Sequence, residues 1–270
     1  MRRVVAAVFL ALAACTTWSA PKAELWERWT AHDPASTKVV DHDPFQRFLD
    51  RYLVSGAAGR PSAVRYGAVT EEDRAALVSY LEDLQRVSPS GLSRDEQMAY
   101  WINLYNGRTV LLILEHYPVK SIRDIRFGST GAGPWDERLL TVEGERLSLN
   151  NIEHNILRPV WKDPRIHYAV NCASISCPEL RSTVYTGAGI DRQLDAAARG
   201  YIASEQGVFA SGGRLRLSSI YDWYRADFGR NERAVLAHIA LYAQEPTKSL
   251  LERFRGRIAY GYDWALNDWP

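Results

Sequence analysis

The feature that most constrains the fold is the long helical pattern over 93–116. A Ser-x-x-Glu capping box opens this segment and a Tyr-Pro pair ends it. Between 101 and 114 the pattern is hydrophobic on nearly every face, which predicts a central, buried helix. Asn103 and Asn106 share one face of this helix. Because a buried carboxamide without partners is costly, we expect both side chains to be hydrogen-bonded.

Shorter periodic segments on both sides of this helix complete the fold prediction. No repeat, low-complexity tract or linker divides the chain, so one domain is favoured. The sequence predicts an α+β fold, namely a helix-dominated single domain with a small, mostly antiparallel sheet packed on the central helix. Further helices are expected from about 43, 70, 150, 191, 218 and 232, and strands at 139–142, 146–149, 165–171, on either side of 211–213, and at 257–267.

Composition narrows the class of protein. The chain is 46% hydrophobic and 24% charged with a net charge of +1, as in a globular protein with a core. No basic stripe with interleaved aromatic residues is present, which argues against nucleic acid as a partner. Nine Trp and fourteen Tyr favour an aromatic-rich core, an aromatic groove, or both.

The N-terminus has the pattern of an export signal. Two arginines precede the apolar run 4–14, which is too short to span a bilayer as a helix but fits a secretory signal. The run ends in Leu-Ala-Ala before Cys15, which resembles the lipobox of bacterial lipoproteins. The resemblance implies a signal peptide over 1–14 and lipidation of Cys15. An ordinary signal peptide cut near Ala20 is the alternative.

Lipidation would make the membrane a partner of this protein. More than one lipid chain on Cys15 gives stable anchoring. Thr16 is not acidic, which favours the outer membrane over the inner one. We therefore expect an exported protein anchored in the periplasm, with a tether over 15–40 and a single globular domain over 41–270.

A polar cluster is expected on a strand that begins at Arg165 and runs into a tight loop ending at Pro178. Alternation places Arg165, His167 and Asn171 on one face and apolar side chains on the other. A guanidinium, an imidazole and a carboxamide on one face of a short strand indicate a functional surface.

The loop after this strand holds Cys172 and Cys177, which allow two chemistries. In an oxidising compartment the pair favours a disulfide that fixes the turn. The alternative is a nucleophilic Cys172, as in thiol hydrolases and acyl transferases. In a straight strand His167 and Cys172 would lie about 17 Å apart, from ~3.3 Å per residue. A catalytic dyad therefore requires a bend in the chain, or His154 as the base.

Other side chains would support such a nucleophile. Glu153 or Asn103 would orient the imidazole, and Asn103, Asn106 and the amides of 173–176 would stabilise an oxyanion. Zinc binding is disfavoured because no second cysteine pair follows, so no metal or other cofactor is expected. The same polar residues suit either a buried network or the wall of a ligand-binding cleft, and we favour the cleft. The candidate zinc ligands are His154, His167, Cys172 and Cys177, and the candidate ligand-binding residues are Asn106, His154, Arg165 and Asn171.

A set of short motifs over about 93–267 is specific in combination. The motifs are WINLYN at 101–106, LSL at 147–149, IEH at 152–154, ILR at 156–158, HYAVNC at 167–172, CP at 177–178 and YDWALN at 262–267. Together they resemble the domain of unknown function 547 family of bacteria and eukaryotes. The resemblance implies a shared fold and a cell-envelope role in bacteria, without a settled reaction.

These features lead to two functional expectations. The first is a cell-envelope lipoprotein whose polar cleft binds or hydrolyses a small or peptide-like ligand, with Cys172 and His167 at its centre. The second is a non-catalytic, disulfide-stapled module that docks another envelope protein. Whether the protein is an enzyme depends on the state of Cys172.

Overall fold

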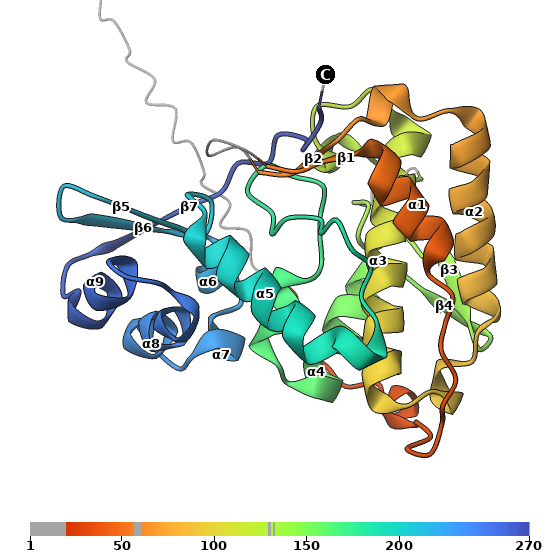
Figure 1. Cartoon of the computed structure of the whole chain (residues 1–270), viewed down its shortest axis with the longest axis horizontal. Helices are drawn as coiled ribbons and strands as arrows, with labels where there is room; N and C mark the ends of the chain where they lie inside the picture. Colours follow the sequence, from red (N-terminus) through yellow and green to blue (C-terminus); the bar gives the residue numbers. More distant parts are fainter. Residues whose placement is uncertain (1–19, 57–60, 129–130, 132, 270) are drawn as a thin grey trace, which may run out of the picture.

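The central helix of the computed structural model is α3 (Arg94–His116), as the sequence predicts. The structure describes residues 20–56, 61–128, 131 and 133–269, so the expected signal peptide and the lipidation site at Cys15 lie outside the described residues. Ser93 caps α3 by accepting a hydrogen bond from the Glu96 amide. Every residue of α3 from Glu96 to Ile113 is buried. Helices α1 (Asp43–Tyr52) and α2 (Glu71–Arg86) lie on one side of α3 (Figure 1).

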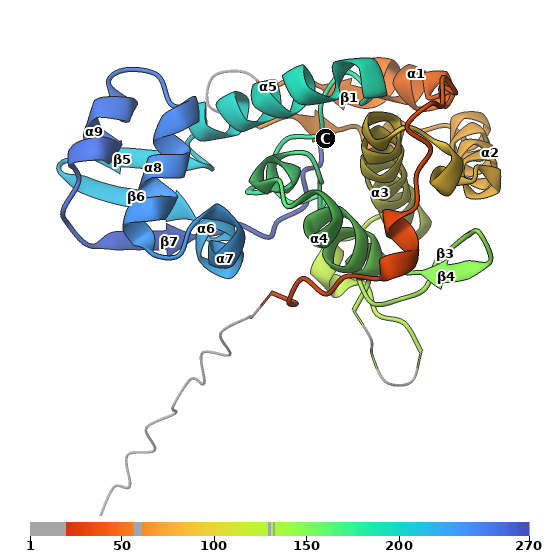
Figure 2. The same ribbon diagram turned by 90° about the horizontal axis from the view of Figure 1, so that it is seen from below.

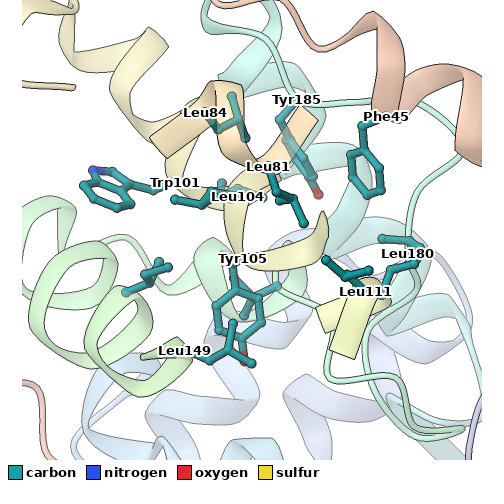
Figure 3. Close-up of a cluster of buried hydrophobic side chains, with 14 of the residues drawn as sticks. Phe45, Leu81, Leu84, Trp101, Leu104, Tyr105, Leu111, Leu149, Leu180 and Tyr185 are labelled. Carbon is teal, nitrogen blue, oxygen red and sulfur yellow. The ribbon is translucent and has the colours of Figure 1, made fainter. Parts of the chain in front are cut away.

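The main core forms around α3. Trp101 packs edge-on against Trp29, with ring centroids 5.1 Å apart. Figure 3 shows Trp101, Leu104, Tyr105 and Leu111 of α3 among buried side chains from α1, α2 and later segments. A second cluster of buried apolar residues lies at the other end of the molecule, and α5 (Ile190–Ala203) extends between the two (Figure 1). The second cluster contains part of α5 and four further helices, α6 (Ile220–Trp223), α7 (Arg225–Phe228), α8 (Glu232–Tyr242) and α9 (Thr247–Arg253). Strands β5 (Val208–Ser211), β6 (Arg214–Ser218) and β7 (Ile258–Gly261) also belong to it.

The strands are few and short, so the predicted α+β, helix-dominated fold is confirmed. Instead of one sheet on the central helix, the strands of the described residues form three small sheets. The largest contains β5, β6 and β7 and belongs to the second cluster, with β5 antiparallel and β7 parallel to β6. The strands are β1 (Leu53–Val54), β2 (Ala63–Val64), β3 (Leu140–Val142), β4 (Glu145–Leu147), β5 (Val208–Ser211), β6 (Arg214–Ser218) and β7 (Ile258–Gly261).

The prediction of a strand from Arg165 is wrong. The segment η6 (Pro164–Tyr168) is a 3₁₀ helix, and an irregular loop follows it. Asp163 caps η6 by accepting a hydrogen bond from the Arg165 amide, and proline at the first helical position fixes a helical φ. This local start signal outweighs the apolar–polar alternation on which the strand prediction rests.

The helix predicted from Asn150 is present but starts differently. Ser148 Oγ accepts a hydrogen bond from the Asn151 amide, whereas the Asn150 side chain caps nothing. The segment η5 (Asn151–Leu157) is π-helical and continues into α4 (Arg158–Trp161). π-Helical turns are rare and occur frequently at functional sites.

Part of the predicted tether is packed on the folded body. In Figure 2 the chain from residue 20 runs past α4. The amides of Glu24 and Trp26 donate hydrogen bonds to the carbonyls of His154 and Asn155. Trp29, in the 3₁₀ helix η1 (Glu27–Thr30), is buried in the main core. Residues 20–40 therefore belong to the folded unit. The remaining 3₁₀ segments are η2 (Tyr66–Ala68), η3 (Pro89–Gly91), η4 (Ile122–Asp124) and η7 (Gly187–Gly189).

Candidate functional site

One pocket brings the predicted thiol and imidazoles together. Its lining comes from α3, from η5 and the chain before it, from η6 and the loop after it, from α6, and from the chain after β7. Titratable side chains line one part: Glu153, His154, His167, Cys172 and Cys177. Large aromatic rings line another part: Tyr105, Trp135, Trp223, Tyr224, Tyr262 and Trp264. The lining is completed by Asn150, Val170, Pro178 and Ile220.

His167 is held by a carboxylate that the sequence analysis missed. Its Nε2 lies 2.7 Å from Asp227 Oδ2. Because the carboxylate accepts this bond, Nε2 carries the proton, and Nδ1 is the nitrogen with a free lone pair. Nδ1 lies 3.7 Å from Glu153 Oε1, beyond hydrogen-bond distance. The ring stacks on Tyr224, with centroids 4.1 Å apart. Asp227 thus has the orienting role that was predicted for Glu153 or Asn103.

Asp227 also binds a buried guanidinium. Arg158 Nε donates to Asp227 Oδ2 at 2.6 Å, and the Arg158 side chain is only 6% exposed. Partial burial would raise the pKa of Asp227, but the hydrogen bonds from His167 and Arg158 outweigh it and hold the pKa well below its ordinary value. The carboxylate therefore stays ionised and fixes both partners.

His154 is held in its neutral form. A guanidinium can only donate, so the 2.9 Å contact from Arg158 Nη1 makes His154 Nδ1 an acceptor and places the ring proton on Nε2. Burial lowers the pKa of His154 below its ordinary value. The pocket is thus lined by a neutral imidazole that can donate one hydrogen bond.

Glu153, like His154, is buried. It is 6% exposed, and Tyr105 donates a hydrogen bond to its Oε2 at 3.3 Å. Its other oxygen, Oε1, faces His154 and His167 at 3.9 and 3.7 Å from their Nδ1 atoms. The π-helical segment η5 therefore directs two consecutive side chains, Glu153 and His154, to one pocket.

Hydroxyl groups rather than an imidazole contact the Cys172 sulfur. Its Sγ lies 3.1 Å from the Tyr262 hydroxyl and 3.3 Å from Ser174 Oγ. Burial would raise the pKa of Cys172, but hydrogen bonds from Cys177, Ser174 and Tyr262 outweigh it, so the pKa is below its ordinary value. Within the described residues neither imidazole is hydrogen-bonded to Cys172, so the predicted direct dyad with His167 is not formed.

The predicted disulfide is not formed either. Cys172 and Cys177 are free thiols in the structure. The Cys172 amide donates to Cys177 Sγ at 2.8 Å, which uses the second sulfur as a hydrogen-bond acceptor. Burial raises the pKa of Cys177 well above its ordinary value. The two neighbouring cysteines therefore have pKa values shifted in opposite directions.

The loop between the cysteines has a constrained backbone. Ala173 has a φ of 58°, in the left-handed region that residues with a Cβ seldom adopt. Asn171 holds both ends of the loop, because its Oδ1 accepts from the Ala173 amide and its Nδ2 donates to the Pro178 carbonyl. Strain of this kind is frequent at functional sites.

Four predicted site residues lie outside the pocket lining. Asn106 contacts the backbone on the near side of the cysteine loop, donating to the Ala169 carbonyl at 2.9 Å and accepting from the Asn171 amide at 2.8 Å. Asn103 makes the equivalent two bonds to the backbone of Tyr185, away from the pocket. Both asparagines are hydrogen-bonded, as predicted, but neither lines the pocket. Asn171 is buried within the loop that it holds.

Arg165 is the fourth residue outside the pocket. Its guanidinium pairs with Asp163, Asp191 and Asp195, at 2.7 to 2.8 Å. Because η6 replaces the predicted strand, Arg165 and His167 do not share the expected strand face. Arg165 instead ties η6 to α5.

Sequence reasoning also missed several functional side chains. Asp227 lies 60 residues after His167, and no local motif connects them. Tyr262 was visible only as part of the YDWALN motif. Trp223 and Tyr224, which no motif singled out, also line the pocket.

The comparison with family models supports the resemblance found in the sequence. Residues 89–202 match a family described as "Protein of unknown function, DUF547". This match supports assignment to the domain of unknown function 547 family. It includes Glu153, His154, His167 and both pocket cysteines, whereas Asp227 lies beyond it. The comparisons with curated proteins and with solved structures found no match.

Among the residues that the structure describes, none of the helices is long and apolar enough to cross a membrane. In the same residues no three His, Cys, Asp or Glu side chains are grouped so as to hold a metal ion. The four candidate zinc ligands therefore do not form a ligand cluster.

Proposed function

We propose that the protein is a thiol-dependent hydrolase or acyl transferase whose nucleophile is Cys172. The observation that carries this proposal is the shared pocket of Cys172, Glu153, His154 and His167. A thiolate attacks carbonyl carbon far better than a thiol does, and here the Tyr262 hydroxyl, which accepts a hydrogen bond from Ser174 Oγ, donates to the Cys172 sulfur. In this site thiolate formation depends on hydroxyl hydrogen bonds, so a direct imidazole contact is not required.

The other side chains suit the remaining steps of acyl transfer. Attack of Sγ on the carbonyl carbon forms a tetrahedral oxyanion, and departure of the leaving group gives a thioester that water or an acceptor then cleaves. His154 Nε2–H supplies a neutral hydrogen-bond donor for the oxygen. His167 Nδ1, with its lone pair free, takes the proton from the attacking water or acceptor. Asp227 and Tyr224 keep the His167 ring in place.

The aromatic wall supports a small or peptide-like ligand. Trp223, Tyr262 and Trp264 are mutually packed, with ring centroids 4.6 to 5.6 Å apart. Trp135 extends the wall through contact with Trp264 at 5.8 Å. Rings of this kind bury much apolar area with little loss of side-chain entropy, and they suit an acyl group or a short peptide segment.

Replacing Cys172 by alanine tests this function. We expect the wild type to hydrolyse a chromogenic acetyl ester and to be labelled by a chloroacetamide at Cys172. The Cys172→Ala variant should lose at least about a hundredfold in turnover, because the covalent route is gone. Exposed, distant Ser211→Ala is the matched control and should keep full turnover. Equal turnover by wild type and Cys172→Ala would reject the proposal.

We further propose that the protein is exported and anchored through Cys15, with the outer membrane preferred. Residues 16–20 separate Cys15 from Pro21, whose carbonyl accepts a hydrogen bond from Arg158 Nη1. At ~3.5 Å per residue, the body would lie within about 20 Å of the lipid. Cys15→Ala should move the protein from the membrane fraction to the soluble fraction in a bacterial host. An unchanged membrane fraction would argue against lipidation.

A further inference from the structure

We propose that Cys172 and Cys177 form a redox-active dithiol that exchanges with the disulfide of a peptide ligand. Cys172 is the attacking thiol and Cys177 the resolving thiol. This reaction uses the same nucleophile as the proposed acyl transfer, so it rests on the reactivity of Cys172, but it needs a second sulfur that acyl transfer does not.

The backbone holds the two cysteines close to each other. The Cys172 amide donates to Cys177 Sγ at 2.8 Å, and the Cys177 amide donates to the Ser174 carbonyl at 3.0 Å, which closes a tight turn. The left-handed Ala173 directs the chain back on itself between them. The turn thus holds Cys177 Sγ beside Cys172 without a bond between the two sulfurs. Asn171, buried within this loop, bonds to both of its ends, so the sulfurs stay near each other in the reduced form.

The two cysteines differ in exposure. Both line the pocket, but Cys172 is partly exposed, whereas Cys177 is only 5% exposed. A disulfide entering the pocket therefore meets Cys172 first. Dithiol oxidoreductases use this division, in which an accessible thiolate attacks and a less accessible thiol resolves the intermediate. A purely structural disulfide would not need hydroxyl contacts from Tyr262 and Ser174 to the Cys172 sulfur.

The exchange consists of two thiolate attacks, each of which releases one ligand thiolate. Cys172 thiolate attacks one sulfur of the ligand disulfide, forms a mixed disulfide and releases the first ligand thiolate, which takes a proton from solvent. Cys177 then loses its proton to solvent and attacks Cys172 Sγ. The second ligand thiolate leaves and is protonated, and a Cys172–Cys177 disulfide remains. The ligand disulfide gains two electrons, and the protein dithiol loses two. A second dithiol of the same chemical class restores the reduced protein by the reverse steps.

Oxidised glutathione serves as the probe for this exchange. Full-length reduced protein carries Cys15→Ala as the background for every variant, so that Cys172 and Cys177 are its remaining thiols. It is mixed with the probe without oxygen, quenched in acid, and analysed by mass spectrometry after alkylation. For the wild type we expect an intramolecular disulfide and two molecules of reduced glutathione per protein. Cys177→Ser should stop at glutathione bound to Cys172, with a mixed disulfide that lives at least about tenfold longer, because the intramolecular thiol is missing. Cys172→Ser should release no glutathione.

A lasting mixed disulfide on wild-type Cys172, or no reaction at either cysteine, would overturn the inference. This measurement on the wild type decides the matter even if Cys177→Ser fails to fold. The ester assay separates the two proposals. Disulfide exchange without ester turnover would reject the hydrolase and leave the dithiol, whereas ester turnover without an intramolecular disulfide would do the reverse.

Discussion

Replacing Asp227 by alanine will lower the free energy of unfolding by about 3 kcal/mol, because the substitution leaves the buried Arg158 guanidinium without its carboxylate. The same change frees His167 Nε2 from its 2.7 Å partner. His167 can then carry its proton on either nitrogen, so ester turnover should also fall, by about a hundredfold or more. Urea unfolding and turnover of the purified variant measure the two effects.

Asp222→Ala is the matched control for this prediction. Asp222 pairs with Arg225 on the neighbouring helices, but both side chains are at least 40% exposed. Exposed ion pairs contribute about 1 kcal/mol or less, so this variant should unfold nearly as the wild type does. Equal losses from Asp227→Ala and Asp222→Ala would show that the Arg158 network does not stabilise the site.

Replacing Asn106 by alanine will have a comparable effect on stability and a separate effect on the thiol. The change leaves the Ala169 carbonyl and the Asn171 amide without their partner. Two unpaired buried backbone groups should cost about 3 kcal/mol of unfolding free energy. Asn171 holds the cysteine loop, so the contacts of Cys172 Sγ with the Ser174 and Tyr262 hydroxyls should loosen. The pKa of Cys172 should then rise toward its ordinary value. Urea unfolding and the pH dependence of alkylation measure the two effects.

Asn103→Ala separates the two effects. It removes the same pair of bonds from the same helix, but the backbone that loses them is that of Tyr185. We expect a similar loss of stability and no change in the pH dependence of Cys172 alkylation. A shift in both variants, or in neither, would contradict the link between Asn106 and the thiol.

The fold was predictable where a pattern is both local and long. The helix at 93–116 has its cap, its apolar faces and its Tyr-Pro end in one continuous segment, and α3 matches it closely. The need to satisfy Asn103 and Asn106 followed from burial alone, and both are bonded to backbone. The strand from Arg165 failed because alternation over a few residues is a weak signal beside the Asp163–Pro164 helix start.

The site was predictable only in part, because its partners come from distant segments. Glu153, His154, His167 and Cys172 were identified from their side-chain chemistry, and all four line the pocket. No motif indicated that Asp227 would orient His167, since their hydrogen bond depends on the packing of η6 against α7. Likewise, Tyr262 reaches Cys172 from a segment 90 residues away. Such contacts depend on tertiary packing that no short motif records.

The pH dependence of Cys172 alkylation tests the central claim most directly. Iodoacetamide labels thiolates, so the rate at Cys172, followed by mass spectrometry, reports the pKa of that thiol. The hydrogen bonds from Cys177, Ser174 and Tyr262 predict a midpoint clearly below the ordinary value of about 8.5, and Tyr262→Phe should move it upward. A wild-type midpoint at or above about 8.5 that Tyr262→Phe leaves unchanged would contradict the account.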